Sequence, residues 1–489
     1  MEQLSARIYS KREKKIKIMQ FGEGNFLRAF VDWMIKRMND EGVYDGHVVV
    51  VQPLPVGRIK DLAKQDGLYT LYLEGIKDGK VVSEHEVIDV LDDFINPYTE
   101  YDKYLSYASL EDLNIIISNT TEAGIVLDKD DTDFLNTPRS FPGKLLAFLI
   151  ARYHHFNGDM SKGLMIVPCE LIDYNGQRLK EVLNELAKIK RLDASFIKWL
   201  NEANEFSSTL VDRIVPGYPK DEIKTIEQEL GYKDNSVVKG EVFHLWVIED
   251  NPRIKKEFEG ASKANLNIVF AKDISPYKER KVKILNGSHT AMVPVAYLSH
   301  IDYVKEAVED KDVGKFVKLL IFEEIVPTIN LDKDDMDKFA SSVLERYANP
   351  FIKHELMSIA LNSTTKFKTR LLPSLLDYYH KINELPRKII FSLASLMVFY
   401  RGKRDGEVIN LQDDEKYLLM WKDLWQKFDN NVYSIDDLVK QVLGKVDLWE
   451  TNLNDIEGLG ELVSTFVSDI LKLGMKRALK KELLQGVKR

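Results

Sequence analysis

The chain has 489 residues, of which 44% are hydrophobic and 30% are charged, as in folded globular proteins. Its net charge of −8 argues against nucleic acid or an anionic membrane as a partner. The single cysteine, Cys169, excludes an internal disulfide framework and fits a reducing cytoplasm. No apolar run approaches the roughly 18 residues of a membrane span, and the polar N-terminus lacks the apolar core of a secretory signal. We therefore expect a cytoplasmic protein of two or three domains.

The N-terminal segment has the pattern of a βαβ unit. Ile16–Phe21 is short, apolar and followed by glycines, which predicts a buried strand. Asn25–Met38 has apolar residues at helical spacing, and His47–Val51 reads as a second buried strand. Two buried strands that are joined through a helix are typical of a parallel pair.

Buried strands and helices continue to alternate along the next two hundred or so residues, which predicts a doubly wound, Rossmann-type α/β domain over residues 1–273. Leu68–Glu74 and Lys80–Val90 are predicted to form a hairpin through Lys77-Asp78-Gly79. The other strands are predicted at Asn114–Ser118, Leu164–Pro168, Val242–Ile248 and Leu266–Val269, and helices at Lys144–Tyr153 and Gly176–Lys188.

After residue 272 the pattern changes to long helical periods, so residues 274–489 are predicted to form a mostly α-helical domain. The helices are predicted at Lys281–Leu298, Val304–Ile321, Leu331–Tyr347, Arg387–Tyr400, Asp414–Lys427, Ile435–Val442 and Gly460–Leu484.

The turn after the first strand has the sequence GEGNF, with glycines at Gly22 and Gly24. Such glycines let backbone N–H groups approach a pyrophosphate, and the following helix N-terminus favours negative charge. The third glycine of the dinucleotide fingerprint is replaced by Leu27. The motif by itself therefore fits a plain turn as well, and its place inside a βαβ unit is what favours a dinucleotide.

The position that usually binds the adenosine ribose is also changed. Gln52 ends the second strand, where an acidic residue would hold the ribose hydroxyls and disfavour a 2′-phosphate. Gln52 can still hydrogen-bond a ribose, so the residues alone leave NAD and NADP open. The polar segment Ser118–Gly124 follows another strand and suits either the ribose–nicotinamide half of a dinucleotide or a capping turn. The predicted cofactor-binding residues are Gln20, Phe21, Gly22, Gly24, Asn25, Phe26, Arg28, Gln52, Asn119, Thr120, Thr121 and Glu122.

The segment KVKILNGSH, residues 281–289, lies at the predicted domain boundary and contains candidate acid–base groups. In a helix, Asn286 and His289 share a face, and Lys281 points toward the same region. A lysine whose pKa is lowered by burial can exchange a proton, and an amide can stabilise an oxygen that gains charge. The spacing does not choose between Lys281 and Lys283, and a solvated helix without a catalytic role gives the same pattern.

These motifs resemble those of the mannitol dehydrogenase family, the polyol-specific long-chain dehydrogenases. The family pattern Lys-x4-Asn-x2-His selects Lys281, Asn286 and His289, and the opening strand–GxGxF–x–R–A is similar to the family's nucleotide turn. Six blocks in order extend the resemblance over nearly the whole chain and favour a branch that acts on hexuronates. They are MQFGEGNFLRAFVDW, SNTTEAGI, PCELIDYNG, STLVDRIVPGYP, ISPYKERKVKILNGSHTA and YANPFIKHEL.

The resemblance implies an NAD-dependent, metal-independent interconversion of D-tagaturonate and D-altronate in hexuronate breakdown, with a small keto-uronate or aldonate as the substrate. It implies that Lys281 is the general acid in reduction and the general base in oxidation. Asn286 and His289 would orient and polarise the reacting carbonyl. The family's Val-Asp-Arg segment near the substrate makes Asp212 a candidate contact, although pairing with Arg213 explains that carboxylate equally well.

Two departures from the polyol pattern affect the substrate site. Leu171 stands where polyol members have an asparagine that contacts the reacting oxygen, and Ser358 stands at the place of a substrate arginine. Another cation must therefore bind the carboxylate of an acid sugar, and we predict Lys366 and Arg370, because an arginine fork binds both carboxylate oxygens. The other candidates are Lys353, His354 and Lys368.

Two alternatives stay open at this point, as does the oligomeric state. The first is a sister activity, oxidoreduction of fructuronate (with mannonate) or of a neutral polyol. The second is a nucleotide-binding regulator without turnover, which would bind NADH but consume none with any uronate.

Overall fold

The computed structural model describes residues 1–120, 124–131 and 133–485. The chain divides into two compact units. The first unit comprises Met1–Gly75 and Val81–Ile274, and the second comprises Ile76–Lys80 and Ser275–Arg489. None of the described helices is long and apolar enough to cross a membrane.

The first unit is built on a six-stranded sheet whose strands are all parallel. The spatial order is β5-β2-β1-β6-β7-β8, which is the doubly wound order of dinucleotide-binding domains and confirms the predicted Rossmann-type fold. The sequence order reverses between β1 and β6, where such sheets bind ligands. The strands are β1 Ile16–Phe21, β2 His47–Val51, β5 Leu91–Ile95, β6 Ile115–Ser118, β7 Met165–Pro168 and β8 Glu205–Phe206.

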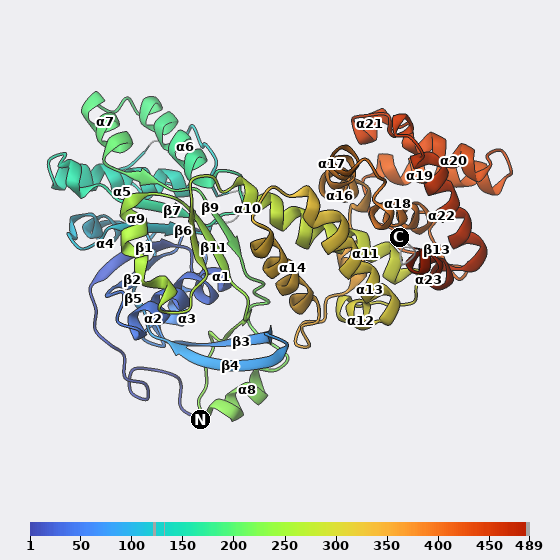
Figure 1. Ribbon diagram of the computed structural model, residues 1–489. Helices are drawn as coiled ribbons and strands as arrows, with labels where there is room; N and C mark the ends of the chain where they lie inside the picture. Colours follow the sequence, from blue (N-terminus) through green and yellow to red (C-terminus); the bar gives the residue numbers. More distant parts are fainter. Residues whose placement is uncertain (121–123, 132, 486–489) are drawn as a thin grey trace. The chain divides into compact units, whose positions relative to one another are not determined.

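The continuous apolar strands arise because both faces of this sheet are covered (Figure 1). Side chains alternate along each strand, so Ile18 belongs to one core and Met19 to the other. The Ile18 core contains apolar residues of α2, α9 and the strands β3 Tyr69–Lys77 and β11 Leu245–Glu249. The Met19 core contains residues of α4, α5, α6 and α7. These helices are α2 Val31–Asp40, α4 Tyr101–Ser106, α5 Phe141–His155, α6 Asn175–Ile189, α7 Ala194–Glu202 and α9 Pro252–Glu257.

The single helix predicted at Asn25–Met38 is wrong, because two helices occupy this stretch. They are α1 Asn25–Ala29 and α2, and Phe30 interrupts them with φ −126° and ψ −79°. The Phe30 ring stacks on Phe26 at 5.0 Å and packs against Trp246 at 5.8 Å. The apolar spacing continues across the break, so periodicity gave no sign of it.

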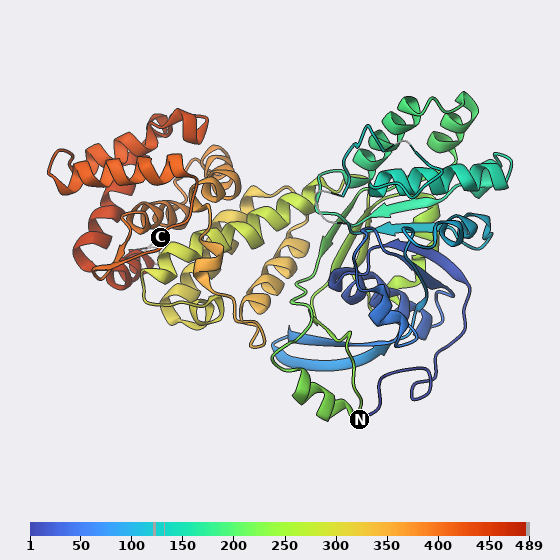
Figure 2. The ribbon, with the colours of Figure 1, turned by 180° about the vertical axis from the view of Figure 1, so that it is seen from behind.

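The predicted hairpin is present and forms part of a second, three-stranded sheet (Figure 2). Its strands β3 Tyr69–Lys77 and β4 Lys80–Ile88 are joined by Asp78 and Gly79, whose positive φ values of 53° and 73° suit a tight two-residue turn. Strand β10 Val238–Glu241 pairs with β3, and α8 Ile223–Leu230 packs on this sheet through a small apolar cluster.

A third sheet contains three strands in the order β12-β11-β9, namely β9 Thr209–Asp212, β11 Leu245–Glu249 and β12 Ile268–Ala271. The sequence predicted β11 and β12 approximately but missed β5, β8, β9 and β10. It also missed the helices α3 Ile59–Ala63, α4, α7, α8 and α9. In β5 the charged Asp92 and Asp93 interrupt the apolar run, so the segment lacks the pattern of a buried strand.

The second unit is mostly helical, as predicted (Figure 2). Besides the tip of the β3–β4 hairpin at residues 76–80, it contains the short strands β13 Lys403–Arg404 and β14 Glu407–Val408. Its α-helices are α10 Ser275–Arg280, α11 Ser288–Tyr297, α12 Val304–Glu309, α13 Lys311–Leu319, α14 Lys333–Tyr347, α15 Leu356–Ile359, α16 Ser363–Arg370, α17 Leu372–Ile382, α18 Arg387–Phe399, α19 Glu415–Asp429, α20 Ile435–Leu443, α21 Val446–Trp449, α22 Leu459–Leu473 and α23 Met475–Gln485.

Three of the predicted long helices are divided. The one predicted at Lys281–Leu298 begins with a π-helix, and the other two have breaks with a local cause. The helix predicted at Val304–Ile321 is interrupted at Asp310, whose side chain accepts hydrogen bonds from the N–H groups of Asp312 and Val313 and so begins α13. The helix predicted at Gly460–Leu484 ends at Gly474, whose φ of 79° only glycine adopts easily.

Candidate active site

The turn after β1 requires glycine at Gly22 and leaves open space at Gly24. Gly22 has φ +120°, and a Cβ there would lie 2.9 Å from the carbonyl oxygen of Asn119. A Cβ at Gly24 would meet no described atom within 4 Å, so packing within the chain does not explain that glycine. Close approach of a ligand does explain it, and the turn therefore fits the pyrophosphate of a dinucleotide.

Arg28 supports this turn from inside the unit. The buried guanidinium donates from Nε to the Glu23 carbonyl at 3.2 Å, from Nη2 to Asn25 Oδ1 at 2.6 Å and from Nη1 to the Ser236 carbonyl at 2.6 Å. These bonds hold the Gly22–Asn25 segment in place. They favour a positioning role for Arg28 and Asn25 over the direct cofactor contact that the sequence suggested.

Buried polar groups also lie behind the turn. The Gln20 amide donates to the Gly22 carbonyl at 3.1 Å and to Asp32 Oδ2 at 3.5 Å. Burial raises the pKa of Asp32 to about 7, and Gln20 and Tyr69 lower it through hydrogen bonds. Gln20 was predicted as a cofactor contact, but its side chain is buried behind the turn. Asp32 was not singled out by the sequence.

The aromatic residues predicted at this turn serve mainly in packing. The Phe21 ring is fully buried against Tyr104 and Phe141, so only the Phe21 backbone belongs to the turn. The Phe26 ring is half-buried on Phe30. Gln52 is buried at the end of β2 and donates to the Leu54 carbonyl at 2.8 Å.

A buried glutamate that the sequence did not single out holds the turn after β6. Glu170 follows β7 directly, and its carboxylate accepts hydrogen bonds from Ser118 Oγ at 3.0 Å and from the N–H and hydroxyl of Thr120 at 3.0 and 2.9 Å. Burial raises the pKa of Glu170. Asn119 donates to the Cys169 carbonyl at 2.8 Å, so both strand ends are tied together. The predicted contacts Thr121 and Glu122 lie outside the described residues.

Asp212 lies buried at the end of β9, in the first unit. Its neighbour Arg213 is buried as well and donates to the carbonyls of Ala29 at 2.6 Å and Phe243 at 3.1 Å, over the ring of Trp33. Burial lowers the pKa of Arg213 to about 9. The other predicted substrate contacts, Lys366 and Arg370, belong to the second unit.

The segment that contains the candidate acid–base lysine was predicted to be an ordinary α-helix, and this prediction is wrong. Lys281–Gly287 forms a π-helix between α10 and α11, in which backbone bonds join residues five apart. In an α-helix two residues five apart point about 140° away from each other. The wider winding instead places Lys281 and Asn286 on one side, and both side chains are partly exposed.

The structure separates the two candidate lysines. Lys283 is buried and pairs with Glu279 at 2.7 Å and with Asp377 at 2.8 Å. The Lys283 ammonium group therefore forms ion pairs with two carboxylates, which is typical of a structural role. The choice of Lys281 for proton transfer stays a prediction from the pattern Lys-x4-Asn-x2-His.

His289 is buried in α11 between aromatic rings. Its imidazole stacks on Tyr347 at 4.2 Å and meets His354 edge-on at 5.2 Å. Its Nε2 has no hydrogen-bond partner in the part of the chain that the structure describes. Burial, with the positive charges of neighbouring residues, lowers the pKa of His289 well below its ordinary value, so the ring stays neutral at neutral pH.

Four basic side chains lower the pKa of His289, namely His354, Arg346, Lys366 and Arg370, and we call the last three the cationic cluster. Arg370 donates to Thr290 Oγ1 at 3.3 Å, and Lys366 donates to the Ile359 carbonyl at 2.7 Å. Burial lowers the pKa of both, and the charge of Arg370 lowers that of Lys366 further. The charge of Asp413 acts on Lys366 in the opposite direction and raises its pKa. The structure thus brings Lys366 and Arg370 near His289, and their binding of a substrate carboxylate stays a prediction.

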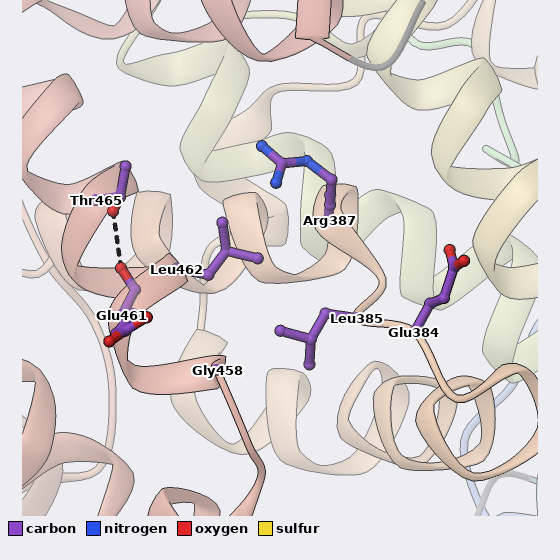
Figure 3. Close-up of a pocket in the computed structure, with 7 residues that line it drawn as sticks. All are labelled: Glu384, Leu385, Arg387, Gly458, Glu461, Leu462 and Thr465. Atoms are coloured by element: carbon purple, nitrogen blue, oxygen red, sulfur yellow. Dashed lines mark hydrogen bonds between the residues drawn. The ribbon is translucent and has the colours of Figure 1, made fainter. Parts of the chain in front are cut away.

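One hollow of the second unit contains none of the predicted site residues. Figure 3 shows this hollow between the start of α18 and α22, where Thr465 donates to the Glu461 carbonyl at 2.8 Å. Arg387 at its edge is already paired with Glu482. Within the described ranges, no three His, Cys, Asp or Glu side chains gather in a way that could hold a metal ion.

Comparison with protein families gives two matches that together span most of the chain. Residues 16–260 match the mannitol dehydrogenase Rossmann domain, and residues 273–471 match the mannitol dehydrogenase C-terminal domain. Altronate oxidoreductase of Bacillus subtilis (strain 168) is 44% identical over 487 residues, which is 99% of each chain.

Two solved structures share the fold. D-sorbitol dehydrogenase in substrate-free form superposes with a TM-score of 0.78, at 19% identity over 98% of this chain and 100% of that chain. The mannitol 2-dehydrogenase of Pseudomonas fluorescens, solved with NAD and D-mannitol, superposes with a TM-score of 0.64, at 19% identity over 99% of this chain and 96% of that chain. At this identity the likeness concerns the fold alone.

Proposed function

Because this chain belongs to the mannitol dehydrogenase family, we propose that it is the NAD-dependent oxidoreductase that interconverts D-tagaturonate and D-altronate. The general class, an NAD-dependent dehydrogenase that acts on a CH–OH group, follows from the family and from the altronate oxidoreductases at about 45% identity. The choice of an acid sugar rests on one observation, the cationic cluster beside the neutral, buried His289.

The first unit is proposed to hold the dinucleotide. The turn at Gly22 and Gly24 offers backbone N–H groups to the pyrophosphate. Arg28 holds this turn through its hydrogen bond to the Glu23 carbonyl. Asn119 and Thr120 lie at the end of β6, where a doubly wound sheet binds the nicotinamide half. Hydrogen bonds to Cys169 and Glu170, just after β7, hold them there. When bound, NADH supplies the hydride, and the protein contributes position and a proton.

The second unit is proposed to supply the proton and bind the substrate. Lys281 donates a proton to the carbonyl oxygen during reduction and takes it back from the hydroxyl during oxidation. Asn286, on the same side of the π-helix, donates a hydrogen bond to that oxygen as it gains charge. The neutral imidazole of His289 has an available Nε2 for a substrate hydroxyl.

The substrate carboxylate is proposed to bind the cationic cluster. The planar guanidinium of Arg370 can bind both carboxylate oxygens, and the Lys366 ammonium adds a point charge. An anion there offsets the repulsion between Arg370 and Lys366, which a neutral polyol does not. We propose that the reaction needs no metal ion, because Lys281 and Asn286 can stabilise the reacting oxygen.

Initial rates separate this function from its alternatives. Purified protein is assayed with tagaturonate, fructuronate and fructose, each with NADH and with NADPH, by the loss of absorbance of the reduced nucleotide. The proposal requires the highest kcat/KM with tagaturonate and NADH. Faster turnover of fructuronate or fructose would assign the sister activity, and NADH binding without consumption would assign a regulator.

A further inference from the structure

The end of β2 lacks the acidic residue that usually selects NAD over NADP, yet a carboxylate reaches the same place from another element. Glu23 lies between the two glycines of the turn after β1, and its Oε1 accepts a hydrogen bond from the N–H of Arg58 at 3.1 Å. Its own carbonyl is fixed by Arg28 at 3.2 Å. The Glu23 side chain therefore extends from the first turn of the sheet to the segment after β2.

Gln52 presents a second acceptor at this point. Its Nε2 donates to the Leu54 carbonyl at 2.8 Å, which turns its Oε1 the other way. A Cβ at Gly57 would lie 2.2 Å from Glu23 Oε1 and 2.5 Å from Gln52 Oε1. Both oxygens therefore converge over Gly57, and a larger residue at position 57 would displace them.

Arg58, the nearby cation that could attract a 2′-phosphate, is engaged elsewhere. Its Nη2 donates to the Asn235 carbonyl at 3.3 Å, its Nε pairs with Asp61 at 3.4 Å, and its guanidinium lies 5.9 Å from the centre of the Tyr218 ring. The backbone N–H of Arg58 donates to Glu23, while its side chain donates to the segment around Asn235. The local charge next to Gln52 is thus that of a half-buried carboxylate.

We infer that Glu23 and Gln52 together bind the vicinal hydroxyls of the adenosine ribose, and that the Glu23 carboxylate excludes NADP. Two converging acceptors match the two O–H donors of a ribose. A 2′-phosphate offers no donor and adds negative charge next to a carboxylate that water screens only in part. Glu23 thereby replaces the acidic residue that is missing at position 52. The inference rests on the proposed function only in taking a nicotinamide dinucleotide as the ligand.

Binding of the nucleotides without a sugar tests the inference. NADH and NADPH are titrated into the full-length protein, and dissociation constants are read from the nucleotide's fluorescence. Glu23→Gln keeps an oxygen for the Arg58 N–H and removes only the charge, so the turn should stay folded. We expect it to weaken NADH about 3–10-fold, to tighten NADPH, and to shift their affinity ratio about 30-fold or more.

Two further variants keep the test sharp. Asp61→Asn removes a carboxylate from the same segment that does not face Gly57, and it should change the ratio less than about 2-fold. Gly57→Ala should weaken NADH because the new methyl group displaces both acceptors. An unchanged ratio in Glu23→Gln, or an equal shift in Asp61→Asn, would overturn the inference.

The outcome is separable from that of the proposed function. If Glu23 controls the choice of nucleotide but no uronate is reduced, the proposed function fails and the inference stands. If tagaturonate is reduced with NADH and Glu23→Gln keeps the wild-type selectivity, the inference alone fails. Wild-type protein that binds neither nucleotide would overturn both.

Discussion

Two regions of the protein use different kinds of polar group. One is the turn after β1 in the first unit, and the other surrounds His289 in the second unit. At the turn, backbone N–H groups and carbonyls dominate, and buried side chains such as Arg28 hold them in place. Around His289 the polar groups include charged side chains, of which Arg370 and Lys366 repel each other. A site made of backbone groups changes little when side chains are substituted, so it suits a cofactor that a whole family shares. A site made of side chains can acquire a new substrate through substitutions.

The largest effect is expected at the proton donor. Lys281→Met should lower turnover of tagaturonate by about 10²–10⁴-fold, because no other group is assigned to protonate the carbonyl oxygen. NADH affinity, measured by fluorescence, should change little, since the turn at Gly22 lies in the other unit. Steady-state rates at saturating NADH check the first point.

Lys283→Met is the matched control for this variant. It removes a lysine that pairs with Glu279 and Asp377, so it should lower the free energy of unfolding by about 1–3 kcal/mol. Its turnover per folded molecule should stay near that of the wild type. Equal losses of turnover in both variants would remove Lys281 from its special role.

The next effect concerns the cationic cluster. Arg370→Ala should raise the KM for tagaturonate about 10–100-fold, because a half-buried carboxylate loses its two-pronged partner. Lys368→Ala removes the same charge from the same helix, α16, at a side chain that pairs with Glu450 at 2.8 Å. That control should leave the KM within about 2-fold. If the two variants behave alike, the carboxylate binds elsewhere.

The two regions should also respond to pH with opposite signs. Asp32 has a folded-state pKa of about 7 against an ordinary value of 3.8, so its contribution to stability is lost as pH rises from about 4 to 7. His289 has a lowered pKa, so its contribution is lost as pH falls below 6.5, where the unfolded chain takes up the proton. Asp32→Asn should flatten the first dependence and His289→Gln the second, each by about 1–3 kcal/mol in urea unfolding. Unchanged pH profiles would contradict these assignments.

The smallest effect is expected on removal of metal ions. Dialysis against a chelator should leave kcat with tagaturonate unchanged, since the proposed proton transfer uses Lys281 alone. Addition of Zn²⁺ or Mg²⁺ to the dialysed protein should restore nothing. A loss of activity that a metal ion reverses would require a different mechanism.

The sequence predicted the parts of this protein that depend on local patterns. The glycine turn and the apolar strands β1, β2, β6 and β7 are visible because a doubly covered parallel sheet needs uninterrupted apolar runs. Strand β5 was missed because Asp92 and Asp93 interrupt such a run. The π-helix was missed because its shifted hydrogen bonds leave the apolar spacing nearly helical.

The candidate sites were predictable to different degrees for the same reason. Lys366 and Arg370 were named from their charge, but only the packing of α11, α14 and α16 shows that they act on His289 together with Arg346. Glu170 and Asp32 gave no signal, because a carboxylate next to a strand or on a helix is usually solvated. Their hydrogen bonds appear only once the strand ends are in place.

The wide winding at Lys281–Gly287 has a consequence for how related chains are compared. In an ordinary α-helix two residues face the same way when they are four apart, so one residue fewer between lysine and asparagine gives the same facing. A homologue with that shorter spacing and regular winding would present the same pair, although the motif no longer matches letter by letter. Gaps in an alignment at this point therefore mark a change of helical pitch, and they do not by themselves mark a loss of catalytic residues.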